Sequence, residues 1–215
     1  MKPITVDIWS DIACPWCFIG KRRFEVALAE FTALPGSRPV QVAYHSFELS
    51  PETPLHFAGS ELAFLVQHKG IPVAEARLML DRVTEIAAGV GLHYDFGSLQ
   101  HTNTLLAHQF LQLATSHGLQ SAAYERLFRA YFEEGRHLGR PAELADLGTE
   151  IGLDPEATAG VLERADFLPA VRADQQAAAA RGIRGVPYYL FDERHVVRGA
   201  ADPAEFLQAL TGSTA

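Results

Sequence analysis

The stretch ITVDIWSDIACPWC, residues 4–17, joins a strand pattern directly to a pair of cysteines. Its first six residues alternate apolar and polar side chains, which is typical of a β-strand. Cys14 and Cys17, the only cysteines of the chain, follow after a short loop. The sequence beyond them is helical in pattern, because apolar residues recur every three or four positions, at Phe24, Leu28 and Phe31. The order is therefore strand, cysteine pair, helix.

A second strand is predicted over residues 39–49 (PVQVAYHSFEL), where apolar residues alternate again. Two strands joined by a helix form a crossover, which implies that they are parallel. The pattern then changes to helices for more than 100 residues. These predicted helices cover residues 60–69, 72–89, 102–117, 121–134, 140–151 and 155–165, with Ser60 as the cap of the first.

The C-terminal part returns to a mixed pattern. A helix is predicted over residues 167–181, followed by a strand pair formed by YYLF (188–191) and HVVR (195–198). Asp202 is predicted to cap a last helix that ends near Gly212. The fold class is therefore α/β with an inserted all-helical domain. The α/β domain is expected over residues 1–50 and 166–215, and the insertion over residues 51–165.

Composition excludes several classes of protein. The 215 residues include 48% apolar side chains, which excludes a disordered chain. With 18 basic and 26 acidic residues the net charge is −8, so the chain lacks the basic excess that nucleic-acid binding uses, and no nucleic-acid partner is expected. Two cysteines exclude a disulfide scaffold.

No targeting or membrane segment is predicted. A secretory signal needs an apolar run of about 7–15 residues, and Asp7 interrupts the N-terminal run before that length. Residues 97–124 carry no charge, but they contain three histidines and several amide side chains, too many polar groups for a bilayer span. We therefore expect a cytoplasmic protein with no membrane partner.

The cysteine pair carries the chemistry. A cysteine between a strand and a helix lies at the helix N-terminus, where unpaired N–H groups and the helix dipole stabilise a thiolate. Cys14 is expected to be this activated, solvent-exposed thiol, and Cys17, one turn further on, the shielded thiol that resolves the intermediate. A lone CxxC is also half of a zinc site, but the chain has no second CxxC and would need histidines from elsewhere. We expect no metal.

A second signal is Gly185-Val186-Pro187, which enters the strand at residue 188. A proline at the start of a strand is usually trans, or marks a sheet edge. Because Pro187 lies downstream of a CxxC and directly before a strand, we interpret it as part of a redox site rather than as an ordinary strand start.

Several motifs together resemble a known family. The sequence resembles the DsbA-like thioredoxin superfamily, and within it the FrnE-like cytoplasmic thiol-disulfide oxidoreductases. The matching pieces are Ser10-Asp11 with Cys14-Pro15-Trp16-Cys17, Tyr44-His45-Ser46-Phe47-Glu48-Leu49, Asn103-Thr104 with Ala107-His108, Tyr131-Phe132 with Gly135, and Gly185-Val186-Pro187.

The resemblance implies a thioredoxin-like fold and an oxidoreductase or isomerase of protein disulfides. It implies a cis bond before Pro187 that faces the CxxC, with the backbone of Val186 pairing with substrate. Trp16, Asn103 and His108 are the further candidates for substrate binding, although helix packing would explain the last two equally well.

The resemblance also implies a buried acid beneath the CxxC that accepts the proton of the second cysteine. Strand alternation makes Asp7 the better candidate and leaves Asp11 in the loop, although a solvated acid would explain either. Periplasmic DsbA has a histidine between its cysteines; Trp16 cannot ionise, so we expect a less extreme thiol here.

A neighbouring branch supplies the alternative function. The glutathione-dependent chromene-carboxylate isomerases and kappa-class transferases typically have serine where Cys14 stands, and both cysteines are retained here. The expected partners are protein thiols and disulfides. No cofactor is expected, and glutathione enters only as a co-substrate.

Overall fold

The computed structural model describes residues 2–55, 57 and 59–213. The chain divides into two compact units, Met1–Leu49 with Asp174–Ala215, and Ser50–Ala173. We call them the α/β unit and the helical unit. The second boundary lies at residues 173–174 rather than at the predicted 166. The reason is that one continuous helix, α8 (Leu168–Ala180), begins in the helical unit and ends in the α/β unit.

In the described part of the chain, the α/β unit contains a four-stranded sheet in the order β2-β1-β3-β4. The strands are β1 (Ile4–Ser10), β2 (Val40–Ser46), β3 (Tyr188–Phe191) and β4 (His195–Arg198). β1 and β2 are parallel, as the crossover predicts, whereas β3 is antiparallel to both β1 and β4. β1 is therefore central, and the cysteine pair follows directly from its C-terminal end.

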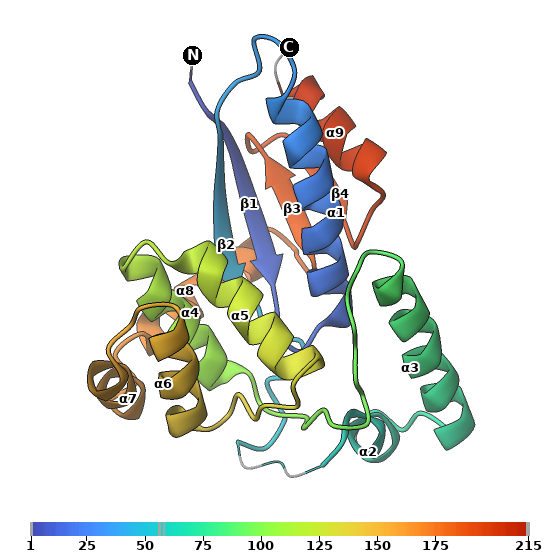
Figure 1. Ribbon diagram of the computed structural model, residues 1–215, viewed down its shortest axis with the longest axis vertical. Helices are drawn as coiled ribbons and strands as arrows, with labels where there is room; N and C mark the ends of the chain where they lie inside the picture. The colour runs from blue at the N-terminus through green and yellow to red at the C-terminus, as the bar shows by residue number, and fades with distance from the viewer. Residues whose placement is uncertain (1, 56, 58, 214–215) are drawn as a thin grey trace. The chain divides into compact units, whose positions relative to one another are not determined.

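One face of the sheet is covered by α1 (Pro15–Thr32) and α9 (Pro203–Gly212), which lie side by side (Figure 1). Alternate residues of β1 point to this face and form its core. This core contains Ile4, Val6, Ile8, Phe24, Ala27, Phe31, Tyr189, Phe191, Val197, Phe206 and Leu210. Apolar residues on one face of β1 and at helical spacing on α1 therefore form two apolar surfaces that pack against each other.

The opposite face is also buried. Trp9 of β1 packs with Tyr188 and Leu190 of β3 and with Ala178, which belongs to the C-terminal part of α8. We call this the α8 face. Both faces of the sheet are thus covered by helices of the same unit. Even-numbered and odd-numbered residues of β1, which point to opposite faces, therefore both lie close to buried side chains.

The end of β2 and the capping of α9 differ from the sequence-based expectation. β2 ends at Ser46 rather than Leu49, because the N–H of Leu49 donates to the carboxylate of Asp11 (2.7 Å) instead of to a strand. Asp202 occupies the N-cap position of α9, but its side chain makes no capping hydrogen bond. It lies 3.5 Å from Arg23 instead.

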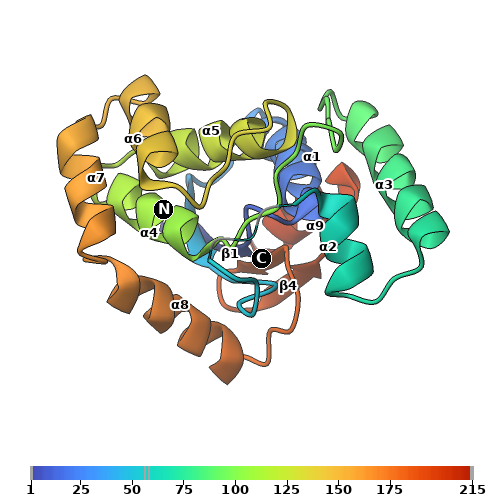
Figure 2. The same ribbon diagram turned by 90° about the horizontal axis from the view of Figure 1, so that it is seen from below.

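The helical unit contains the helices that the sequence predicts. They are α2 (Glu61–Gln67), α3 (Val73–Ala88), α4 (Leu105–Ser116), α5 (Gln120–Phe132), α6 (Pro141–Glu150) and α7 (Pro155–Glu163). α2 packs against α3, and α4 to α7 pack with one another (Figure 2). The Ser60 hydroxyl caps α2 by accepting from the N–H of Ala63, as predicted. In the described residues, no helix has the length and apolarity needed to cross a bilayer.

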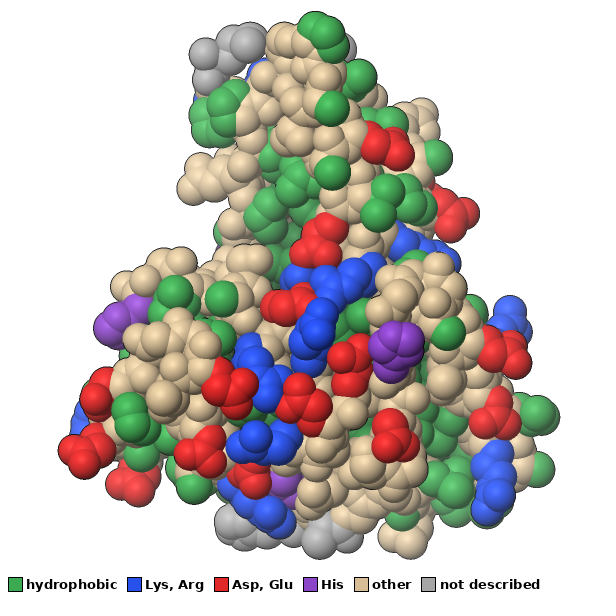
Figure 3. Space-filling view, viewed as in Figure 1, with side chains coloured by type: hydrophobic (Ala, Val, Ile, Leu, Met, Phe, Trp, Pro, Cys, Tyr) green, Lys and Arg blue, Asp and Glu red, His purple; other side chains and the backbone are tan. Residues whose placement is uncertain are grey.

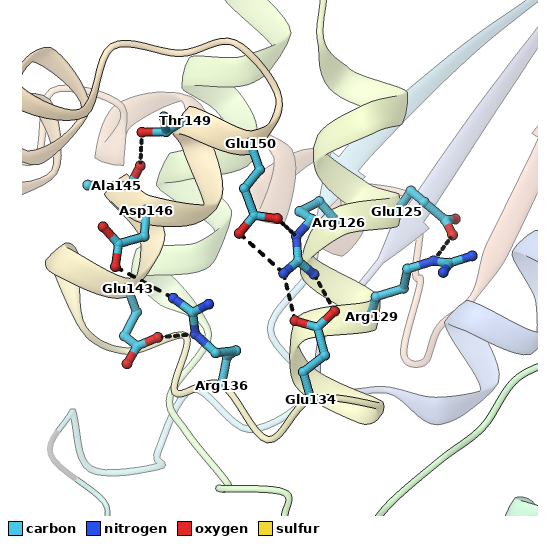
Figure 4. A network of polar contacts seen from close by, with 10 residues as sticks. All are labelled: Glu125, Arg126, Arg129, Glu134, Arg136, Glu143, Ala145, Asp146, Thr149 and Glu150. Carbon is cyan, nitrogen blue, oxygen red and sulfur yellow. Dashed lines mark hydrogen bonds and ion pairs between the residues drawn. The ribbon is translucent and has the colours of Figure 1, made fainter.

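An ion-pair network ties α5 to its neighbours in this unit (Figure 4). The guanidinium of Arg126 contacts Glu134 (2.6 Å) and Glu150 (2.7 Å). Arg136 pairs with Glu143 in the same region. On the face drawn in Figure 3, basic and acidic side chains lie next to one another over this unit rather than in separate patches.

Candidate active site

Cys14 and Cys17 lie at the start of α1. Cys14 is the N-cap residue, with extended backbone angles, and Pro15 takes the first helical position, where its missing N–H costs nothing. The N–H of Cys14 donates to the carbonyl of Asp11 (3.1 Å), and that of Cys17 to the carbonyl of Cys14 (3.0 Å). These bonds form a tight turn that presents one thiol at the helix terminus and the other inside its first turn.

Both cysteines are free thiols, and both are buried, with 3% of Cys14 and 2% of Cys17 exposed. The expectation that Cys14 is open to solvent is therefore wrong. Its Sγ donates a hydrogen bond to the carbonyl oxygen of Val186 at 3.5 Å, so this segment covers it. Trp16, between the two cysteines, is 40% exposed and forms the accessible part of the motif.

The environment of Cys17 keeps that thiol protonated. Burial raises the pKa of Cys17 well above its ordinary value, and the hydrogen bond to Cys14 raises it further. Hydrogen bonds from the Ser10 side chain and the Asp11 backbone lower the pKa by less. Cys17 is therefore poorly suited to attack first, and can act once a proton acceptor is present.

The Val186–Pro187 segment faces Cys14 although 172 residues separate the two in sequence. The Val186–Pro187 peptide bond is cis. The carbonyl of Pro187 accepts from the N–H of Gly199 (2.8 Å), which ties this segment to the end of β4. The backbone of Val186 is therefore held next to the dithiol by the sheet itself.

Gly20 allows α1 to approach this segment closely. A Cβ atom at Gly20 would lie 2.8 Å from the Tyr189 hydroxyl and 3.1 Å from Cγ of Pro187. Any larger residue would push α1 and the start of β3 apart. Sequence analysis did not single out this glycine; its place inside a predicted helix is the signal that could have found it.

Asp11 is a site residue that sequence analysis undervalued. Only 1% of it is exposed, and its carboxylate accepts from the N–H of Ala13 (3.4 Å) and of Leu49 (2.7 Å). It therefore joins the loop before the cysteines to the segment after β2. The available signal was the loop itself, whose backbone N–H groups need acceptors when buried.

Asp7 does not lie beneath the cysteines. Its carboxylate is 2.8 Å from Nε2 of His45, on the α8 face, whereas α1 with Cys17 covers the other face. The side chain of Ile8 points to the face that α1 covers. Asp7 points to the opposite face, so the prediction that it lies beneath the cysteines and accepts the proton of Cys17 is wrong.

His45 is the centre of that cluster. Its Nδ1 is 3.0 Å from Asp174 of α8, its Nε2 binds Asp7, and its ring stacks on Trp9 at 4.6 Å between centroids. Burial alone would lower the pKa of His45, but hydrogen bonds to Asp174 and Asp7 outweigh it and raise the pKa from 6.5 to about 9. Asp174 also accepts from the N–H of Ser46 (2.8 Å), so a charged imidazolium joins β1, β2 and α8.

Asn103 and His108 belong to the helical unit. The Asn103 amide donates to the carbonyl of Thr53 (2.8 Å) and its oxygen accepts from the N–H of Leu105 (2.9 Å). His108 is fully buried on α4. These placements favour the packing role for both over the predicted contact with substrate.

Nothing in the described residues forms a group of three or more His, Cys, Asp or Glu side chains that could hold a metal ion. The chemistry that this arrangement can perform is that of two thiols, one at a helix terminus and one buried behind it.

Comparison with solved structures identifies proteins of the same fold. The chain is 36% identical to a probable DsbA oxidoreductase from Streptomyces coelicolor, with a TM-score of 0.91 over 98% of this chain and 90% of that one. Two more distant structures share the fold. One is the cytosolic disulfide reductase DsbM from Pseudomonas aeruginosa, with 21% identity and a TM-score of 0.62 over 97% of this chain and 94% of that one. It has also been solved with glutathione, GSH.

The other distant structure is a 2-hydroxychromene-2-carboxylate isomerase, with 16% identity and a TM-score of 0.69 over 98% of this chain and 95% of that one. At sequence level, residues 5–211 match the family described as a DSBA-like thioredoxin domain. This match covers nearly the whole chain, including both cysteines and the Val186–Pro187 segment. The chain therefore belongs to the family of DSBA-like thioredoxin domains, with the helical unit inserted into its thioredoxin fold.

Proposed function

We propose that this chain is a thiol–disulfide oxidoreductase or isomerase that acts on protein disulfides through the Cys14–Cys17 dithiol. The observation that carries the proposal is the position of Cys14. Its Sγ lies at the N-terminus of α1 and 3.5 Å from the carbonyl of Val186. A substrate segment that pairs with the backbone of Val186, as an added strand, brings its disulfide directly to that sulfur.

The proposed reaction transfers two electrons from the dithiol. The thiolate of Cys14 attacks one sulfur of the substrate disulfide, the S–S bond breaks, and the first substrate sulfur leaves as a thiolate that takes up a proton. Cys17 then loses its proton and attacks the Cys14 sulfur, which releases the second substrate thiol. The substrate gains two electrons and two protons, and Cys14 and Cys17 become an intramolecular disulfide.

The raised pKa of Cys17 suits this order of events. While Cys17 keeps its proton, it does not compete with Cys14 for the substrate. Once the mixed disulfide has formed, the departing substrate thiolate is a base close to Cys17, so it serves as the acceptor for that proton. No buried carboxylate needs to take this part.

We place the activity in the cytoplasm, where dithiols are kept reduced, and this favours reduction and isomerisation over oxidation. Glutathione is the proposed reducing co-substrate. Two molecules regenerate the dithiol by successive exchange and leave as glutathione disulfide. The glutathione-bound structure of DsbM, a protein of the same fold, supports this choice.

Trapping of the mixed disulfide tests the assignment of the two thiols. Cys17→Ser should accumulate covalent protein adducts in a cell extract, which dithiothreitol releases, because the resolving thiol is missing. Cys14→Ser is the matched control and should accumulate none. Equal trapping by the two variants, or trapping by Cys14→Ser alone, would show that the roles are assigned wrongly.

The same control variant distinguishes the glutathione-dependent isomerase function. That branch has serine at the position of Cys14, so an isomerase should keep its activity in Cys14→Ser. The proposed exchange requires the sulfur, so Cys14→Ser should lose insulin reduction completely. Retained insulin reduction would refute the proposal.

A further inference from the structure

A cavity of about 400 Å³ lies within the α/β unit, with the cis-proline segment Val186–Pro187 in its wall. It is lined by residues 182–188 together with Arg198 and Gly199. Val186 is part of its wall, and the carbonyl of Val186 is the group in contact with Cys14 Sγ. A substrate segment that pairs with Val186 therefore has its neighbouring side chains at this cavity.

The lining of the cavity is basic although the chain is acidic overall. The sequence has 26 acidic and 18 basic residues, yet the lining contains Arg184 and Arg198 and no carboxylate. Both arginines are exposed. Within the described part of the chain, neither guanidinium makes an ion pair or a side-chain hydrogen bond, so both are available to a ligand.

The position of Arg198 is fixed by an aromatic ring rather than by an acid. Its guanidinium carbon lies 5.4 Å from the centre of the Tyr188 ring, and Tyr188 is itself buried on the α8 face. A cation–π contact orients an arginine without neutralising it. Arg198 thus keeps its full charge and its hydrogen-bond donors for a carboxylate.

Arg181, the residue just before the cavity wall, has an acidic neighbour outside the lining. Glu193 is 3.8 Å from it, and 76% of the Glu193 side chain is exposed. A long, exposed ion pair of this kind contributes little. The cavity next to Val186 therefore remains a site for negative charge.

We infer that the cavity selects disulfides that carry a carboxylate within two residues of the reacting cysteine, recognised by Arg184 and Arg198. This inference rests on the proposed function and adds to it the chemical class of the substrate. An acidic segment of a protein and glutathione disulfide, in which each half has two carboxylates, both meet that requirement.

Single-turnover kinetics with the pre-reduced protein tests the inference, because the dithiol supplies both electrons and no added reductant is needed. The substrates are two disulfide-linked peptides of equal length, one with Glu and one with Gln beside the cysteine. Each exposed charge pair is worth roughly a 1.5- to 5-fold change in the rate constant. The Glu peptide should therefore react roughly 2- to 10-fold faster at low salt, and near-molar salt should remove the difference.

Four variants complete the design. Arg184→Gln and Arg198→Gln should each reduce the Glu-to-Gln ratio, and the double variant should bring it close to one. Arg194→Gln is the matched control: it removes an equal charge from an exposed arginine in the β3–β4 turn, outside the cavity lining, and should leave the ratio unchanged. The rate with the Gln peptide is the reference within each variant, so any effect of the substitution on the dithiol itself cancels in the ratio.

A second pair of substrates separates the two sources of the carboxylate. Glutathione disulfide is compared with its carboxyl-esterified form, and a preference for the free acid in either pair supports recognition of carboxylates by the arginines. Equal rates within both pairs, or an equal loss in Arg194→Gln, would overturn the inference while the proposed function stands. Failure of every disulfide to react with the wild-type protein would refute the proposed function instead.

Discussion

Replacement of His45 by Gln should remove a pH-dependent part of the stability of the α/β unit. His45 binds Asp174 and Asp7, and these bonds raise its pKa from 6.5 to about 9. The folded state thus binds a proton more tightly than the unfolded state, so stability decreases as pH rises. The contribution is complete below pH 6.5 and is lost as the pH passes through about 9.

The size of the effect follows from the two pKa values. One pKa unit of difference between the folded and unfolded states corresponds to about 1.4 kcal/mol. The pKa shift of His45 therefore sets an upper limit of about 3 kcal/mol on its contribution to stability. The imidazole is 25% exposed, and solvent screening therefore lowers the expectation to about 1–3 kcal/mol. Neutral Gln leaves the two carboxylates close together without a cation between them.

Urea unfolding at about pH 6 and about pH 10 measures this contribution. The difference in unfolding free energy between wild type and His45→Gln should be largest at the lower pH and should shrink by about 1–3 kcal/mol at the higher one. Cys17 also has a raised pKa, so the two proteins are compared at each pH, and its contribution cancels. His195→Gln, at an exposed position of β4, is the control.

Two results would refute the reasoning. One is a difference between wild type and His45→Gln that does not change with pH. The other is a difference that grows as pH rises, which would mean that His45 is neutral in the folded protein. A similar pH-dependent change in His195→Gln would show that the effect is not specific to the cluster.

Three further substitutions are predicted to lower the free energy of unfolding in urea. Gly20→Ala should cost about 1–3 kcal/mol because the added methyl group meets the start of β3. Its control, Gly160→Ala, should be neutral or gain up to about 1 kcal/mol, because that methyl group meets only a flexible arginine. Equal effects of the two substitutions would contradict the close approach of α1 to β3. Arg126→Gln should cost about 1 kcal/mol or more at low salt because it breaks two ion pairs. Arg129→Gln breaks one ion pair within a helix and should cost about 0.5 kcal/mol or less. The prediction fails if high salt leaves the difference between these two costs unchanged. Asn103→Ala should cost about 1–3 kcal/mol, since it removes the side-chain partner of the buried Thr53 carbonyl and of the partly buried Leu105 N–H. An unchanged stability would contradict a structural role for Asn103.

Local sequence rules were sufficient for the elements and for the redox motif. The alternation in β1, the proline at the first position of α1 and the spacing of Phe24 and Phe31 depend only on neighbours along the chain. The parallel pairing of β1 and β2, the β3–β4 pair and the helices of the insertion were therefore predictable. The cysteine pair was predictable for the same reason, since its turn forms within a few residues.

Long-range packing decided the partners of the polar groups. Alternation shows that Asp7 and Ile8 point to opposite faces, but not which face α1 covers, because helices pack on both faces of this sheet. Alternation alone therefore allows Asp7 to lie beneath the cysteines, whereas the structure places it with His45. The partner of His45 on α8 lies 129 residues away, and no local pattern marks it.

The surroundings of the thiols were decided in the same way. The burial of Cys14 depends on the Val186 carbonyl, and the loop before it depends on the bond from Leu49 to Asp11. These groups meet only when the sheet has assembled, since strand order brings together segments that are far apart in the chain. The amino-acid sequence alone thus specifies which residues can do thiol chemistry, whereas the folded sheet decides which groups cover, bind and orient them.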